Sequence, residues 1–306
     1  MRIDRPYHEG ERSVQERAGE RAVADANGRV IDTTVPVPAL GFVRQQPMAV
    51  LTSVDRQGRP WSSLLFGVPG FLQADSPERL TADLSRAWPH RDDPFWANIA
   101  SDPRVGLLLI ELATRRRLRV NGSARSDRET LDLQVERAYP NCPKYIQRRH
   151  LSERPVVREE VLPDPIRGKT LTPDQRSMIA GADTLFVASL HPAHGADASH
   201  RGGKPGFAQV LDSTTLRIPD YPGNSMFNTL GNFTAHPRGG ILVPDFEGRR
   251  TLQLVGEVEI RWDLGDPGGV TGGTGRFWDF AIHETLELPL PIRVTWELLD
   301  ASPFNP

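Results

Sequence analysis

Hydrophobic and polar residues alternate along several short stretches of the chain, which is the pattern of half-buried β-strands. In the clearest stretch, 251–260, the apolar residues that share one face are Leu252, Leu254, Val258 and Ile260. Glu247-Gly248, just before this stretch, is typical of a hairpin turn. Other short apolar runs that predict strands cover 184–190, 206–211, 214–219 and 240–246.

The same order of elements occurs twice along the chain. The stretch 98–124 matches 232–258 without a gap. The residues of the first stretch that meet an identical residue in the second are Asn98, Pro103, Arg104, Gly106, Leu108, Arg116, Leu118 and Gly122. Upstream, 48–53 resembles 184–189, and Gly58-Arg59-Pro60 resembles Gly203-Lys204-Pro205. We therefore predict a duplication over about 46–125 and 182–262.

Short antiparallel strands crossed by one short helix are typical of small β-barrels. The prediction is a mainly β, α+β protein built from tandem split barrels. Its expected segments are an N-terminal arm with a helix near 11–24 (1–45), a first barrel repeat with a degenerate site and a helix (46–150), a linker with a helix (151–181), and a second, ligand-binding repeat with a C-terminal strand (182–306).

Two capping boxes predict helices in the region that connects the repeats. Ser126 and Glu129 have the spacing of the first box, which predicts a helix to about Ala138. Thr172 and Gln175 form the second box, with a proline at the first helical position.

Composition narrows the functional classes. The chain has 306 residues, 38% of them hydrophobic, and a net charge of -2, which argues against a nucleic-acid or anionic-membrane partner. Its preference for arginine over lysine suggests a high-GC bacterial gene. A single cysteine, Cys142, excludes an internal disulfide and a cysteine-cluster metal site. We find no long apolar run or signal-peptide core, so we expect a cytoplasmic protein.

The segment 218–240 has the first candidate chemistry. A rigid PDYPGN turn precedes Asn224, Asn228 and Asn232, which would share one face if the helix began at the turn. Asparagine can donate to and accept from a flavin ring, and a helix N-terminus suits a phosphate. The alternative is that Asn224 is only an N-cap and the other two are solvated.

A second cluster covers 198–204, which we expect in the turn between two strands. Its polar side chains are Ser199, His200, Arg201 and Lys204. A guanidinium, an ammonium and close backbone approach at glycines suit a phosphate, whereas the alternative is an ordinary polar hairpin loop. The corresponding segments of the first copy, 56–60 and 90–96, lack most of these groups.

A third stretch, 139–149, holds the lone cysteine. Cys142 beside Lys144 could be a reactive thiolate, although a single cysteine is more often a small packing residue. Lys144 and Tyr145 could reach a neighbouring ligand. The pair His191 and His194 has no acidic partner at a metal-like spacing, so no metal is expected.

Taken together, these segments resemble the pyridoxamine 5'-phosphate oxidase-like family of FMN-binding split barrels, in its long two-barrel branch. The motifs that carry the resemblance are Ser199-His200-Arg201-Gly202, Pro205-Gly206-Phe207, Pro219-Asp220-Tyr221-Pro222-Gly223-Asn224 and Leu230-Gly231-Asn232. The likeness spans nearly the whole chain. It implies FMN near a barrel–barrel or subunit interface, and a homodimer.

The resemblance also implies roles for individual residues. Ser199, Arg201 and the segment 224–229 would hold the phosphate and ribityl chain, with Asn232 near the ring or chain. The full set of expected cofactor contacts is Ser199, His200, Arg201, Lys204, Asp220, Gly223, Asn224, Phe227, Asn228, Thr229 and Asn232, with Lys144 and Tyr145 as further candidates. His200 and Tyr221 are candidates for proton transfer.

The implied activity is an FMN-dependent oxidation or reduction of a small-molecule substrate, with NAD(P)H or a separate reductase as electron source. The basic side chain that true oxidases of this family carry on the cofactor helix is absent at Asn228 and Thr229, which argues against pyridoxamine phosphate as substrate. A non-catalytic flavin carrier, or a haem-binding barrel with His200 as axial ligand, are the alternatives.

Overall fold

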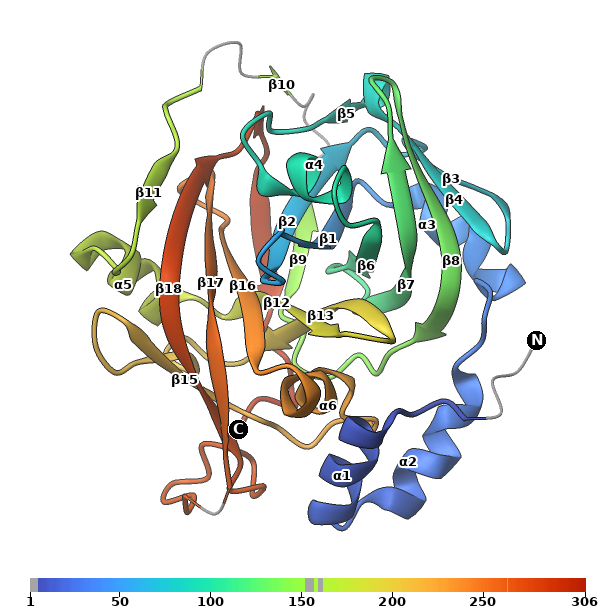
Figure 1. Cartoon of the computed structure of the whole chain (residues 1–306). Coiled ribbons are helices and arrows are strands. Elements are labelled where there is room, and N and C mark those ends of the chain that lie inside the picture. The colour runs from blue at the N-terminus through green and yellow to red at the C-terminus, as the bar shows by residue number, and fades with distance from the viewer. Residues whose placement is uncertain (1–4, 152–156, 159–161, 263) are drawn as a thin grey trace.

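The computed structural model describes residues 5–151, 157–158, 162–262 and 264–306. Its two large sheets are antiparallel and curl side by side, the first in blue to green and the second in yellow to red (Figure 1). Short helices accompany them, so the predicted α+β fold with tandem split barrels is confirmed. None of the described helices is long and apolar enough to cross a membrane.

The first sheet has the strand order β3-β4-β8-β7-β6-β1-β2-β5. Its strands are β1 (Met48–Val54), β2 (Pro60–Gly67), β3 (Leu72–Ser76), β4 (Arg79–Asp83), β5 (Ala87–Trp88), β6 (Arg104–Glu111), β7 (Arg116–Ser126) and β8 (Thr130–Pro140).

The second sheet has the order β13-β12-β16-β17-β18-β15-β14, and β11 also pairs with β18. Its strands are β11 (Ile166–Gly168), β12 (Thr184–His191), β13 (Gly195–Gly202), β14 (Gln209–Val210), β15 (Thr215–Pro219), β16 (Arg238–Asp245), β17 (Arg250–Arg261) and β18 (Phe277–Pro289). Two small ribbons pair β9 (Arg148–Leu151) with β20 (Trp296–Asp300), and β10 (Val157–Arg158) with β19 (Ile292–Arg293).

The helices are short. The α-helices are α1 (Glu9–Arg17), α2 (Arg21–Asn27), α3 (Leu40–Gln45), α4 (Pro94–Ile99), α5 (Pro173–Gly181) and α6 (Asn228–Ala235), and the 3₁₀ turns are η1 (Gly28–Val30), η2 (Val37–Ala39) and η3 (Leu84–Arg86). Helix α5 begins at the predicted capping box of Thr172 and Gln175, which is confirmed. The single helix expected near 11–24 is two helices, because Gly19 adopts a positive φ of 71° between them.

The predicted duplication is confirmed. The elements β1, β2, α4, β6, β7 and β8 return in the same order as β12, β13, α6, β16, β17 and β18. Pairing is also equivalent, since β1 lies between β2 and β6 as β12 lies between β13 and β16. The repeated order of the elements does not test the boundaries of the four predicted segments, which stay predictions.

Three local predictions are wrong. Residues 126–138 form a hairpin of β7 and β8, not a helix, because the Asp127 carboxylate accepts from the N–H groups of Glu129 and Thr130 and makes a tight turn. The stretch 198–204 is not a turn, since β13 runs to Gly202. The run 206–211 contains only the two-residue strand β14.

The proposed match between Gly58-Arg59-Pro60 and Gly203-Lys204-Pro205 is also wrong. The first lies at the start of β2, whereas the second follows the end of β13. Strand pairing instead aligns 67–71, with the sequence GVPGF, with 203–207, with the sequence GKPGF. Each segment leaves the second strand of its barrel, so the glycines keep the same turn in both copies.

The two barrels pack against each other within one chain. Strand β13 lies against β6 and β7, and β2 lies against β16 and β17. A Cβ added at Gly106 would come within 2.6 Å of the Ala198 backbone nitrogen, and one added at Gly240 within 2.3 Å of the Pro60 carbonyl oxygen. These two glycines are equivalent in the repeat, so they bring the two barrels into backbone contact in a pseudo-symmetric way.

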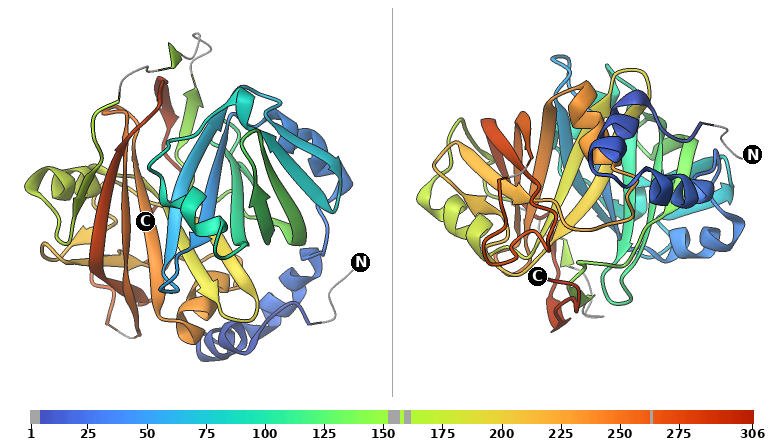
Figure 2. Two further views of the ribbon diagram at one scale, coloured as in Figure 1. Left: turned by 45° about the horizontal axis from the view of Figure 1, so that its top comes forward. Right: turned by 90° about the horizontal axis from the view of Figure 1, so that it is seen from below.

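The N-terminal helix α1 is held on α6 by a similar contact, visible at the bottom of Figure 1 and from below in Figure 2. A Cβ at Gly10 would lie 2.3 Å from the Gly231 carbonyl oxygen, and one at Gly231 would lie 2.6 Å from the Glu11 backbone. The Gln15 side chain donates to the Met226 carbonyl oxygen at 3.1 Å. The N-terminal arm is therefore part of the second barrel's packing.

A hydrogen bond that recurs in both copies ties each short helix to the first strand of its barrel. Asn98 Nδ2 donates to Ser53 Oγ at 3.0 Å, and Asn232 Nδ2 donates to Ser189 Oγ at 2.9 Å. All four side chains are buried. The repetition indicates a structural role for this asparagine in both barrels.

We expect Asn98→Ala and Asn232→Ala each to lower the free energy of unfolding by about 1–3 kcal/mol, because each leaves a buried serine hydroxyl without its donor. Double-mutant cycles with Ser53→Ala and Ser189→Ala, measured by urea unfolding, should give a coupling of about 1 kcal/mol in both copies. Coupling in one copy alone would contradict the shared structural role.

Candidate functional site

A pocket with a volume of about 100 Å³ lies where the two barrels meet, and it is partly open to solvent. The first barrel contributes β7 and the loop 141–145, and the second contributes the end of β13, the loop 220–227 and the start of α6. The pocket therefore requires both barrels.

Most of the residues expected to contact a cofactor line this pocket. They are Lys144, Tyr145, His200, Arg201, Asp220, Gly223, Asn224, Phe227, Asn228 and Thr229, and Tyr221 lines it too. Ser199 and Asn232 are buried just behind the wall, and Lys204 is exposed outside it. Their roles in binding stay predictions.

Three arginines converge on the pocket. Arg119 donates from Nη1 to the Asp197 carboxylate at 3.1 Å across the barrel interface. In the described part of the chain, Arg117 and Arg201 have no carboxylate within ion-pair distance. Burial, together with Arg119 and Arg201, lowers the pKa of Arg117 to about 9. Asp220 and Asp197 partly offset the charge of Arg201, whereas no carboxylate among the described residues offsets that of Arg117.

His200 has a free donor at the same place. Its Nδ1 lies 3.3 Å from Arg117 Nη1, which can only donate, so the ring proton is on Nε2. Burial first, and then the surrounding arginines, hold the pKa of His200 well below its usual value, so the ring is neutral. The described structure gives Nε2 no hydrogen-bond partner.

Other N–H donors around the pocket also lack a hydrogen-bond partner. The buried side-chain nitrogens of pocket residues that have no partner in the described structure are Arg117 Nε, Arg119 Nε, Asn141 Nδ2 and His200 Nε2. Buried donors are rarely left unpaired in folded proteins. Because all four are N–H donors, the chemistry they call for is an acceptor-rich, anionic group.

The start of α6 adds to this polarity. The helix begins at Asn228, so the expectation that Asn224 shares a helical face with the other asparagines is wrong. Asn224 lies in the preceding loop, where its Oδ1 accepts from the Met226 N–H at 3.1 Å. The N-cap, Phe227, has a φ of 57° and no side chain that can accept. No side chain therefore caps the first turn, whose residues line the pocket.

The backbone is unusual on this wall. Tyr145, Ser225 and Phe227 line the pocket and have positive φ values of 66°, 60° and 57°. Such conformations are uncommon for residues other than glycine and tend to cluster at functional sites. The Tyr145 ring lies 4.8 Å from that of Tyr221, and its hydroxyl donates to the Pro222 carbonyl oxygen.

Asp220 is bound by the protein itself. Its Oδ2 accepts from Arg276 Nε at 3.1 Å. Burial raises the pKa of Asp220, while Arg201 and Arg276 oppose this shift. This aspartate therefore anchors the PDYPGN loop to β18's start and is not free to pair fully with Arg201.

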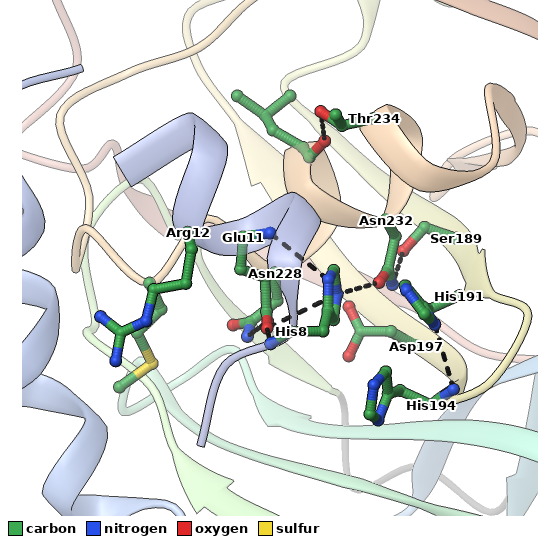
Figure 3. A network of polar contacts seen from close by, with 12 residues as sticks. His8, Glu11, Arg12, Ser189, His191, His194, Asp197, Asn228, Asn232 and Thr234 are labelled. Atoms are coloured by element: carbon green, nitrogen blue, oxygen red, sulfur yellow. Dashed lines mark hydrogen bonds and ion pairs between the residues drawn. The ribbon is translucent and has the colours of Figure 1, made fainter. Parts of the chain in front are cut away.

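The face of α6 that carries Asn228 and Asn232 turns toward helix α1 (Figure 3). Asn228 Nδ2 donates to the Glu11 carboxylate, and Asn232 Oδ1 is hydrogen-bonded to His8 Nε2 at 3.0 Å. Sequence reasoning gave the N-terminal arm no role here. No motif marks Glu11 or His8, and only the contact of Gly10 with Gly231 explains how α1 approaches.

Sequence reasoning also missed Arg117, Arg119 and Arg276 as site residues. The alternation of the RRRLR stretch does place Arg117 and Arg119 on one face of β7. That signal could not be used, because nothing in the sequence says which face of β7 meets the other barrel.

The equivalent place in the first copy differs. Strand pairing aligns Arg117, Arg119 and Arg201 with Thr251, Gln253 and Leu65. There the Asp93 carboxylate accepts from Ser63 Oγ at 2.6 Å and from Gln253 Nε2 at 2.8 Å. The first copy thus lacks the arginines and fills the position with its own buried carboxylate.

A histidine cluster lies beside the α1 contact. The ring of His8 lies 4.1 Å from that of His191 and 5.4 Å from that of His194. The rings of His8 and His194 are stacked, whereas the His191 ring is tilted against both. Across the described residues, no group of three or more His, Cys, Asp or Glu side chains is arranged to hold a metal ion.

Residues 39–160 match the family model described as pyridoxamine 5'-phosphate oxidase. No curated protein matches the chain.

Three solved structures that are similar to part of this chain differ in what their names describe. A protein related to general stress protein 26, of the pyridoxinephosphate oxidase family, from Clostridium acetobutylicum is 11% identical, with 40% of this chain and 90% of that chain covered and a TM-score of 0.30. A FAD-binding protein from Mesorhizobium loti is 14% identical (39% and 96% covered, TM-score 0.26). HupZ from Group A Streptococcus is 15% identical (43% and 98% covered, TM-score 0.29).

The family match falls on the first barrel, and the second barrel repeats the same elements in the same order. The family match in the first barrel and the motifs in the second barrel thus point to the same kind of fold. Residues 39–160, which cover the first barrel, are therefore similar to the pyridoxamine 5'-phosphate oxidase family.

Proposed function

We propose that the pocket between the barrels binds FMN and that the protein is an FMN-dependent oxidoreductase with a small-molecule substrate. The observation that carries the proposal is the set of buried, unpaired N–H donors on Arg117, Arg119, Asn141 and His200, beside the Arg201 guanidinium. A phosphate monoester supplies several acceptor oxygens and up to two negative charges, which match this set. The similarity of the first barrel to the pyridoxamine 5'-phosphate oxidase family supports a flavin as the rest of the ligand.

The size of the pocket supports this assignment for the phosphate end. A volume of about 100 Å³ accommodates a phosphate group, whereas pockets for whole cofactors usually measure roughly 300–1,000 Å³. The ribityl chain and ring would therefore extend through the open side of the pocket.

The residues of the chain would divide the work as follows. Arg117 and Arg201 would neutralise the phosphate, and His200 Nε2 would donate a hydrogen bond to it. When bound, the flavin supplies the hydride and electron chemistry, which the protein orients. Burial, then Tyr145, raises the pKa of Tyr221 to about 12, so its hydroxyl stays protonated at neutral pH and could give a proton to a substrate.

Both halves of the pocket come from one chain, so FMN binding does not require a second chain. The homodimer, the cytoplasmic location and the bacterial source stay predictions. NAD(P)H or a separate reductase is proposed as the electron source, and the small-molecule substrate remains to be identified by turnover.

Arg201→Ala should weaken FMN binding roughly 10- to 100-fold, because a charge-assisted hydrogen bond contributes about 1.5–3 kcal/mol. Quenching of flavin fluorescence during titration measures this. Arg79→Ala is the control, since Arg79 is exposed and pairs with Asp132 away from the pocket. Equal affinity of Arg201→Ala and the wild type would remove the phosphate assignment.

The alternative function is a flavin carrier without catalysis. Anaerobic addition of NADH or NADPH to the FMN complex separates the two functions. An oxidoreductase that uses these donors should lose its absorption near 450 nm within seconds to minutes, and reoxidise with an acceptor. If only a separate reductase, and neither nicotinamide, reduces the bound flavin, the carrier function is favoured.

A further inference from the structure

We propose that Glu11 is a positioning residue that couples proton uptake to the binding of the anionic ligand, by setting the orientation of the Asn228 amide in the pocket wall. The inference rests on the proposed function, because it takes the phosphate of FMN as the anion. It adds the N-terminal arm to the site, through α1.

Glu11 lies in the first turn of α1 and its side chain is 1% exposed. Oε2 accepts from the His8 backbone N–H at 2.8 Å, and Oε1 accepts from Asn228 Nδ2 (Figure 3). The other end of the amide, Asn228 Oδ1, lies 3.4 Å from Arg119 Nη1. An ionised Glu11 therefore holds Asn228 with its amino group turned to α1 and its oxygen turned to the arginine.

This orientation is unfavourable for an anion. Asn228 lines the pocket, but its amino group is turned toward α1, where Glu11 accepts one of its two N–H donors. A protonated Glu11 has an O–H that can donate to Asn228 Oδ1. The amide can then rotate, so that Nδ2 becomes a donor for the ligand and Arg119 is freed from the amide oxygen. Protonation of Glu11 and binding of an anion should therefore favour each other.

The groups around Glu11 have opposing effects on its pKa. Arg137 on β8 favours the carboxylate, and Asp197 on β13 opposes it. Arg119 on β7 and Tyr7 also interact with it. Burial lowers the pKa of His8 to about 3, with His191 and His194 acting the same way, so His8 adds no charge. Burial outweighs the remaining terms and raises the pKa of Glu11 to about 7.

The sign of the coupling follows. Above pH 7 the ligand-free protein has Glu11 ionised, so a bound anion must draw a proton onto it. Affinity should fall as pH rises from 7, in addition to the effect of the phosphate's own ionisation near pH 6, which acts in the opposite direction.

Glu11→Gln mimics the protonated side chain, since it keeps an oxygen for the His8 N–H and offers an N–H to Asn228. We expect this variant to bind FMN up to about tenfold more tightly than the wild type at pH 8, one unit above the pKa of Glu11, and to lose the fall in affinity above pH 7. Calorimetry in two buffers of different ionisation enthalpy should show proton uptake by the wild type and less by the variant.

Glu9→Gln is the matched control, because Glu9 is exposed on the same helix and should behave as the wild type. Asn228→Ala is a second variant that keeps Glu11 but removes the amide, and its proton uptake should fall to the level of Glu11→Gln. If Glu11→Gln does not fold, the proton uptake of Asn228→Ala still tests the coupling.

The outcomes separate the two proposals. If FMN binds, and Glu11→Gln and Asn228→Ala take up as many protons as the wild type, the coupling is wrong and the FMN site stands. If FMN does not bind, the proposed function fails, and the same titrations with inorganic phosphate test Glu11 alone. Absence of phosphate binding, or equal pH profiles for the wild type and Glu11→Gln, would overturn the coupling.

Discussion

The backbone contact between the two barrels is the constraint on which the rest of the structure depends. At Gly106 and Gly240, the absence of a side chain lets strands of one barrel touch the backbone of the other. This contact sets β7 beside β13, so that Arg119 of the first barrel pairs with Asp197 of the second. A side chain at Gly106 would push β6 away from β13, which forms one wall of the pocket, and a side chain at Gly240 would push β16 away from β2 at the pseudo-symmetric position.

The close packing of the two barrels is electrostatically unfavourable at the end of the interface where the pocket lies. Arg117 and Arg201 are brought close to each other and to Arg119, and burial disfavours their charges. At the pseudo-symmetric position the same geometry buries Asp93 among neutral donors. The two copies therefore share one architecture and differ in charge: the first copy pairs its buried polar groups with its own carboxylate, and the second has buried N–H donors for which we propose a ligand.

Some of this could be predicted from the sequence. The repeat was visible because eight residues of 98–124 are identical in 232–258, among them Asn98 and Asn232, whose bonds to serine recur in both copies. Helix α5 was predictable because its capping box is local. The capping-box pattern failed at Ser126, where alternation of Leu131, Leu133 and Val135 on one face of a strand was the stronger signal. Local residue types cannot decide between a helix start and an Asx turn when tertiary pairing favours the strand.

The site was predictable only in part, for a related reason. His200, Arg201 and the loop before α6 were found through motifs, and they do line the pocket. Arg117 lines the pocket from the other barrel, and Glu11 of the N-terminal arm contacts Asn228 in the pocket wall. Both are brought there by packing between distant segments. No local pattern encodes such contacts, so the half of the site contributed by the first barrel required the structure.

The central claim is that two barrels of one chain build one flavin site between them. Its most direct test is the number of FMN molecules bound per chain, measured by titration to saturation together with the mass of the complex in solution. The account predicts one FMN per chain, whether the chain is alone or dimeric. Two per chain would mean that the Asp93 position also takes the ligand, and one per two chains would mean that the site lies between subunits.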